Sequence, residues 1–207
     1  GEGQRTGIWN PCTDPTPASL RDGFTITRGK ELYGGGIFNA AASPTLRNLV
    51  IKNNQAWFGY LSAAYDPKGG GIYNYLSNPV ITNVQILNNL SSGSYQPKGG
   101  GMYNEASNPV LQNVLFSGNG ASYGSAIFTM SGHISLENAT IAGNSAQNIN
   151  GNAIYSFAEY EAISIKNSIV YGGTLAGWGL YSIEQSLIEN NTDTSNGNID
   201  ATGILVT

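Results

Sequence analysis

Short apolar segments alternate with polar, turn-forming segments along the chain, and one six-residue pattern returns three times. Residues 34–39 read GGGIFN, residues 69–74 read GGGIYN and residues 99–104 read GGGMYN. Weaker copies, in which an apolar residue precedes an aromatic one, follow at residues 125–128, 152–155 and 178–181. The apolar residue falls at positions 37, 72, 102, 127, 154 and 180, so the repeat is 25 to 35 residues long.

A second apolar segment follows each of the first five copies and carries an Asn at a fixed place. These segments cover residues 44–51, 79–86, 109–116, 134–141 and 163–170. They are short, rich in β-branched residues and alternate apolar with polar positions before the Asn, which predicts strands rather than helices. Extra residues enter between this segment and the next glycine run, so we expect loops of variable length there.

A repeat of about 25 residues cannot bury its own apolar side, so neighbouring repeats must stack. We therefore predict an all-β fold, a single-stranded parallel β-helix (solenoid) of about six to seven coils. Stacking in register predicts columns of like residues. The two apolar columns are Leu46, Ile81, Leu111, Leu136 and Ile165, and Ile26, Ile51, Ile86, Phe116, Ile141 and Val170. An aromatic column contains Phe38, Tyr73, Tyr103, Phe128, Tyr155 and Tyr181.

The repeated pattern of the second segment places an amide side chain at the same bend of every turn. There it can bond to turn backbone and to its copies on the turns above and below. We interpret this column as a structural ladder made of Asn48, Asn83, Asn113, Asn138 and Asn167.

The predicted organisation has three parts. Residues 1–18, with three prolines, form an N-terminal extension or cap, residues 19–191 form the β-helix, and residues 192–207 lead to a cap or a further region. The open ends of a solenoid expose unpaired strand groups. We expect either the terminal segments to cover them or end-to-end self-association, including assembly in a larger complex.

Three motifs resemble a family of bacterial secreted and surface proteins with β-helix repeats, the polymorphic-outer-membrane-protein-like and choice-of-anchor-type proteins. They are DGFTIT at residues 22–27, the GGGIYN repeats, and GNIDA at residues 197–201. The resemblance implies a right-handed parallel β-helix and an extracellular or bacterial cell-surface location. Residues 202–206 read TGILV where the family usually has DPLFV. The family includes adhesins, surface fibres and polysaccharide lyases and hydrolases, and the fold alone does not choose among them.

The number and placement of charged residues exclude some classes of function. Charged residues make up 11% of the chain, against roughly 25% in typical soluble domains. Nine Lys and Arg residues are scattered singly in a chain of net charge −4, so no basic stripe is available for nucleic acid. No apolar run approaches the length of a membrane span.

The sequence offers few candidates for catalytic residues. Glycoside hydrolysis needs two carboxyl groups a few ångströms apart, and the 13 Asp and Glu residues fall at different phases of the repeat. The best arrangement for a lyase base is Asp66 with Lys68 and Lys98, since the lysines occupy equivalent positions on adjacent turns; a solvated edge is the alternative. One His and one Cys indicate no metal site, and we expect no cofactor and no catalytic residue.

Binding candidates gather in the variable loops, which are aromatic. The candidate surface contains Trp57, Tyr60, Tyr65, Lys68, Tyr95, Lys98 and Tyr123. Aromatic rings on an uncharged polar surface stack on sugar rings or anchor proteins, although the rings could instead fold back over the core. The first hypothesis is therefore a non-enzymatic adhesive, spacer or assembly module whose partners are surface glycans or another protein. The alternative is a protein that binds or degrades polysaccharide as a lyase or glycoside hydrolase.

Overall fold

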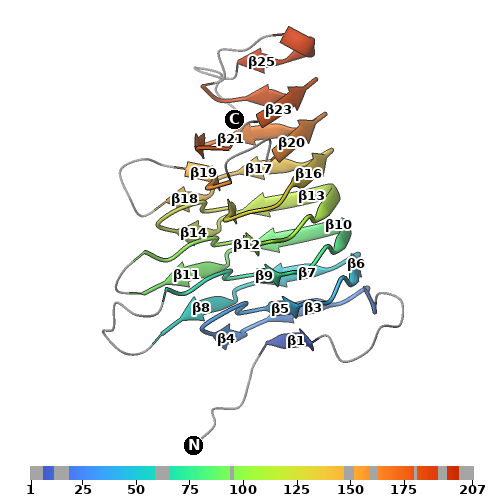
Figure 1. Cartoon of the computed structure of the whole chain (residues 1–207), viewed down its shortest axis with the longest axis vertical. Coiled ribbons are helices and arrows are strands. Elements are labelled where there is room, and N and C mark those ends of the chain that lie inside the picture. Colours follow the sequence, from blue (N-terminus) through green and yellow to red (C-terminus); the bar gives the residue numbers. More distant parts are fainter. Residues whose placement is uncertain are drawn as a thin grey trace, which may run out of the picture.

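The chain runs repeatedly through three parallel β-sheets, so that each turn lies on the previous one (Figure 1). The computed structural model describes residues 7–11, 19–58, 66–93, 96–146, 152–158, 163–179, 181–190 and 195–200. Every strand pair within these ranges is parallel. The all-β class is confirmed, and the parallel stack is compatible with a solenoid.

Sheet 1 contains the glycine-aromatic segments. In spatial order its seven strands are β1 (Ile8–Pro11), β5 (Ile37–Ala40), β9 (Ile72–Tyr75), β12 (Met102–Glu105), β15 (Ile127–Thr129), β19 (Asn152–Ser156) and β22 (Thr174–Gly177). The strand β1 falls within the predicted N-terminal extension and pairs with β5.

Sheet 2 contains the Asn-centred segments. Its main path is β2 (Leu20–Asp22), β6 (Thr45–Arg47), β10 (Val80–Leu87), β13 (Val110–Ser117), β17 (Thr140–Ala142), β21 (Ile169–Tyr171), β24 (Leu187–Ile188) and β25 (Ile199–Asp200). Beside this path lie β3 (Thr25–Thr27), β7 (Val50–Lys52), β16 (Ile134–Glu137), β20 (Ile163–Lys166) and β23 (Tyr181–Glu184).

Sheet 3 is formed by the segments that precede the variable loops. Its strands are β4 (Lys30–Glu31), β8 (Gln55–Trp57), β11 (Leu90–Ser92), β14 (Gly120–Ala121) and β18 (Ser145–Ala146). One 3₁₀ turn, Ser195–Gly197, precedes β25.

The predicted apolar columns are confirmed. Successive members of each column are register partners on neighbouring strands of sheet 2. All of them are buried in one continuous core, which also receives Ile37, Ile72, Met102, Ile127 and Ile154 from sheet 1. Each buried aliphatic side chain contributes roughly 1.5–3 kcal/mol before the entropy of ordering is subtracted.

The aromatic column lies on the outer face of sheet 1 and forms a separate cluster. Phe38 and Tyr73 stack with ring centroids 5.0 Å apart, and Tyr103 stacks on Phe128 at 5.1 Å. Tyr181 was wrongly assigned to this column. It pairs instead with Ile163 in sheet 2, and Ala176 is the partner of Tyr155. The late turns are shorter, so the repeat spacing no longer reports the register: Ile165 and Ile183 are partners although only 18 positions apart.

Two kinds of amide ladder connect the turns. The predicted bend residues are exposed and left-handed, with φ between 48° and 55°, and the amide of Asn83 bonds to those of Asn48 and Asn113 at 3.2 and 3.1 Å. A second ladder, buried at the next corner, was not predicted; it contains Asn54, Asn89, Asn119 and Asn144. The first three amides there each donate to the next amide oxygen at 3.0 Å. Another buried run in sheet 1 is joined in the same way at 2.7, 2.7 and 2.8 Å; it contains Asn10, Asn39, Asn74 and Asn104.

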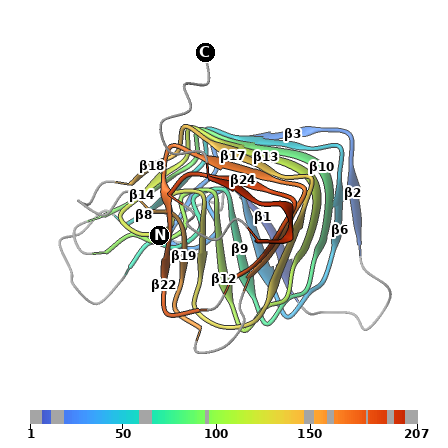
Figure 2. The ribbon, with the colours of Figure 1, turned by 90° about the horizontal axis from the view of Figure 1, so that it is seen from above.

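The turns become smaller toward the C-terminus. Seen from above, β24 lies inside the outline of β6 and β10 (Figure 2). The rod therefore tapers toward its C-terminal end.

Candidate functional site

A column of four residues folds back over the aromatic cluster. Tyr33, Lys68, Lys98 and Tyr123 are paired from turn to turn by single parallel bridges. Each is followed by a glycine with positive φ; at Gly69 (φ 69°) a Cβ atom would lie 2.3 Å from the carbonyl oxygen of Ile72. Only glycine allows so tight a reversal. The reversal places the ring centroid of Tyr33 5.5 Å from that of Tyr73, and the ring centroid of Tyr123 5.4 Å from that of Tyr155.

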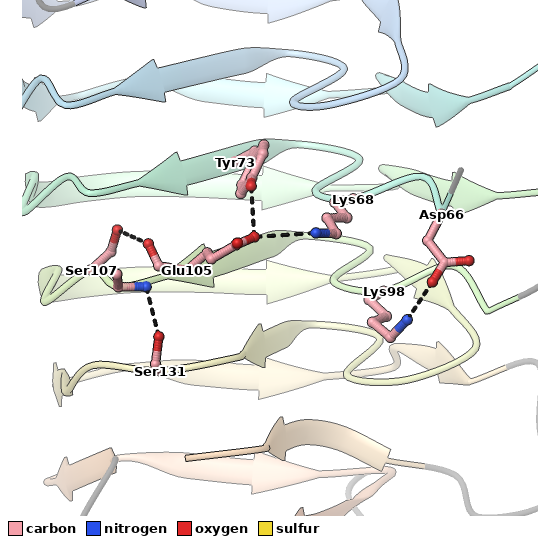
Figure 3. A network of polar contacts seen from close by, with 8 residues as sticks. Asp66, Lys68, Tyr73, Lys98, Glu105, Ser107 and Ser131 are labelled. Atoms are coloured by element: carbon pink, nitrogen blue, oxygen red, sulfur yellow. Dashed lines mark hydrogen bonds and ion pairs between the residues drawn. The ribbon is translucent and has the colours of Figure 1, made fainter. Parts of the chain in front are cut away.

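The first polar group of the site joins two adjacent turns around Glu105. The Nζ of Lys68 lies 3.1 Å from Oε2 of Glu105, and the hydroxyl of Tyr73 donates to the same oxygen at 2.7 Å (Figure 3). The ammonium group also lies over the ring of Tyr103, 5.0 Å from its centroid. Burial, followed by the bond to Glu105, holds the pKa of Tyr73 far above its usual value. Tyr73 therefore stays a neutral donor.

The second polar group is the ion pair between Lys98 and Asp66. Their Nζ and Oδ2 atoms are 2.7 Å apart, and the other oxygen of Asp66 accepts the backbone N–H of Gln96 at 3.4 Å. The lysine and aspartate side chains are only 18% and 23% exposed. Both lysines thus contact a carboxylate from another turn (Figure 3).

The corner that follows Glu105 is also connected across turns. The hydroxyl of Ser107 donates to the carbonyl oxygen of Glu105 at 2.9 Å, and the N–H of Ala106 donates to the hydroxyl oxygen of Ser131 at 2.9 Å. Glu105 is therefore held at its backbone and at its side chain.

This arrangement suits a clamp, meaning ion pairs from Lys68 and Lys98 that hold adjacent turns together, better than a catalytic base. A lysine that acts as a base must present its nitrogen to a substrate. Lys68 and Lys98 instead each donate to one carboxylate, and the ammonium group of Lys68 also lies over the ring of Tyr103. Chemically, the cluster can hold turns together and neutralise its own charges.

The remaining sequence-predicted site residues are not all in this cluster. Trp57 lies in sheet 3, is 41% exposed, and has Nζ of Lys30 3.9 Å from its ring centroid. Tyr123 packs against Tyr155 rather than projecting outward. Tyr60, Tyr65 and Tyr95 lie outside the described residues. The structure thus brings together Lys68, Lys98 and Tyr123, whereas Trp57 lies on another sheet.

Sequence reasoning missed Glu105 and Tyr73 as the partners of Lys68. A signal was present, because Glu105 follows the third GGGxYN unit at a position where Tyr75 follows the second, and these two residues are register partners. In an outward-facing column an acidic residue opposite a lysine-bearing turn favours a cross-turn pair.

Comparison of the chain with family models, curated proteins and solved structures gave no match. Within the described ranges, no helix is long and apolar enough to cross a membrane. No group of three His, Cys, Asp or Glu side chains suitable for a metal ion occurs in that part of the chain.

Proposed function

We propose that this chain is a non-enzymatic, right-handed parallel β-helix of about six to seven coils that acts outside the cell, at a bacterial surface, as an adhesive, spacer or assembly module. The location and the bacterial origin rest on the sequence motifs at residues 22–27, 69–74 and 197–201.

One observation carries the proposal: the charged side chains of the candidate site form ion pairs with each other between adjacent turns. The ion pairs Lys68–Glu105 and Lys98–Asp66 each connect different turns. Together with the buried amide ladder they resist separation of neighbouring coils, which is the requirement for a stiff spacer. A hydrolase or lyase would instead have to present these groups to a substrate.

The test separates adhesion from catalysis. The purified chain is incubated with a panel of neutral and acidic polysaccharides, and new reducing ends and unsaturated products are measured. In parallel, beads carrying the chain are applied to immobilised glycans and extracellular matrix proteins. We expect retention of beads without cleavage. Cleavage that disappears in Asp66→Asn and Lys98→Met variants would overturn the proposal and establish the degrading alternative.

A polysaccharide-binding protein is the second candidate function. It is favoured by Trp57, which is 41% exposed on sheet 3 although Nζ of Lys30 lies over its ring. Loss of retention on glycan beads in a Trp57→Ala variant would assign binding to the loop edge.

A further inference from the structure

A strip of exposed side chains runs along the rod beside the aromatic cluster. It consists of Tyr75, Glu105, Met130, Phe157 and Trp178, one residue from each of five successive turns. Tyr75 and Glu105 are register partners, and the backbone bonds from Met130, Phe157 and Trp178 to the preceding turns continue the same register.

The strip and the buried aromatic column share the outer face of sheet 1. Within a strand, residues two positions apart point to the same side, and the rings of Tyr73 and Tyr75 are accordingly 6.4 Å apart. Yet Tyr73 is 5% exposed whereas Tyr75 is 40% exposed. The reversed loops cover the first column and leave the second in contact with solvent.

Exposure is greatest at the C-terminal end of the strip. Met130 and Phe157 are 41% and 37% exposed and Trp178 is 69% exposed. The rings of Phe157 and Trp178 stack with centroids 4.8 Å apart, so each ring covers one face of the other and the indole is held in a fixed orientation. Large exposed apolar side chains in a contiguous row mark an interaction site.

The charge of the strip restricts its ligand. Its one charged side chain, the partly buried Glu105, accepts bonds from Lys68 and Tyr73, so its charge is neutralised within the protein. Three positions further along the turns, the exposed side chains of Asn78 and Asn108 provide uncharged amides, joined at 3.2 Å. A neutral ligand with both apolar faces and hydroxyl groups matches this combination.

The shape of the strip favours a chain-like ligand over a folded protein. Four intervals of about 4.8 Å give a row about 19 Å long, but the row is one side chain wide. A stable protein interface needs about 800 Å² on each partner. An extended peptide that adds to a sheet requires free backbone groups, and the strands here bond to neighbouring turns.

We propose that the strip binds a neutral polysaccharide whose chain lies along the rod axis, with sugar rings in contact with the exposed parts of Trp178, Phe157 and Tyr75. Pyranose rings present C–H groups on their faces and hydroxyls at their edges, which suits aromatic platforms flanked by amides. The inference rests on the proposed adhesive function and names a ligand class and a surface for it, away from the loop edge that contains Trp57.

The test is affinity electrophoresis of the full chain in gels containing soluble xyloglucan, galactomannan or mixed-linkage β-glucan, with polygalacturonate as the charged comparison. At least one neutral polymer should retard the chain, and polygalacturonate should not. Trp178→Ala should weaken binding about fivefold to tenfold, which is the loss expected for one ring contact. Phe24→Ala, which removes a 40% exposed ring beside β3 in sheet 2, is the matched control and should leave binding unchanged, and Trp57→Ala tests the loop edge.

Circular dichroism checks that the Trp178→Ala variant has folded. Tyr75→Ala is the second strip variant in the same assay. Retardation that survives both strip variants, or that is lost only with Trp57→Ala, overturns the strip as the site while the adhesive function stands. Absence of retardation by all neutral polymers overturns the ligand class, and bead retention on matrix proteins then tests adhesion separately. A dimer in light scattering that dissociates in Trp178→Ala would reassign the strip to self-association and also overturn the proposal.

Discussion

Replacing Asn89 by alanine tests how much the buried amide ladder contributes to the rod. Asn89 is 1% exposed, and its side chain makes four hydrogen bonds between turns. Its oxygen accepts the N–H and the amide of Asn54, each at 3.0 Å. Its nitrogen donates to the carbonyl oxygen of Ile51 at 2.8 Å and to the amide oxygen of Asn119 at 3.0 Å.

The expected loss follows from these four bonds. At roughly 0.5–1.5 kcal/mol net for each, Asn89→Ala should lower the free energy of unfolding by about 2–6 kcal/mol. It also removes the oxygen to which the buried N–H of Asn54 donates. A whole domain is stable by only about 5–15 kcal/mol, so the effect should be large.

Asn83→Ala is the matched control, because Asn83 belongs to the exposed ladder. Its two amide contacts are longer, 3.2 and 3.1 Å, and lie in solvent. The main effect there is an alanine at φ 55°, which costs about 1–2 kcal/mol. Urea unfolding followed by circular dichroism measures both variants, and hydrogen exchange locates the weakened turns. An Asn89→Ala loss no greater than that of Asn83→Ala would refute the reasoning.

Three further predictions concern packing, ionisation and the clamp. Gly70→Ala should prevent correct stacking, because its Cβ would lie 2.5 Å from the carbonyl oxygen of Gly100. At Gly23 an added Cβ meets no atom within 4 Å and only the φ of 77° opposes it, so Gly23→Ala should fold with a loss of about 1–2 kcal/mol. Soluble yield and thermal melting compare the two variants. Burial raises the folded-state pKa of several tyrosines above the unfolded value of about 10, so stability should be fully present below pH 10 and be lost above it. The tyrosines concerned are Tyr73, Tyr103 and Tyr181. Spectrophotometric titration should show their phenols ionising only when the protein unfolds. Ionisation of all tyrosines near pH 10 in the folded protein would contradict this. A double-mutant cycle with Lys68→Met and Glu105→Gln should give a coupling of about 0.5–1 kcal/mol, since both side chains are partly buried, and a coupling of zero would remove the clamp.

The core was predictable because it depends on side chains that repeat with the turn. Leu46, Ile81 and Leu111 can be aligned by eye, and they are buried register partners. The buried amide ladder was missed for a physical reason. Asn54 and Asn89 stand at segment ends, where Asn is also common in exposed turns, and only the direction of the corner sends their side chains inward.

The candidate site was less predictable than the core. Lys68 and Lys98 were placed on one column from the sequence, and the bridge between them agrees. Asp66 was grouped with the two lysines from the sequence and pairs with Lys98, whereas Glu105, the partner of Lys68 at the end of β12, was not predicted. That pairing depends on how the glycine reversal lays one segment over another, which no spacing rule contains.

Spin-label distances along one column test the in-register parallel stack most directly. Thr45, Val80, Val110, Ser135, Ser164 and Ser182 are successive register partners in sheet 2. With Cys12 replaced by serine, labels at Thr45 and at Val110, Ser164 or Ser182 should be separated by about 10, 19 and 24 Å, increasing by about 4.8 Å for each turn. Distances that do not increase in this order, or that indicate antiparallel neighbours, would contradict the stack and everything derived from it.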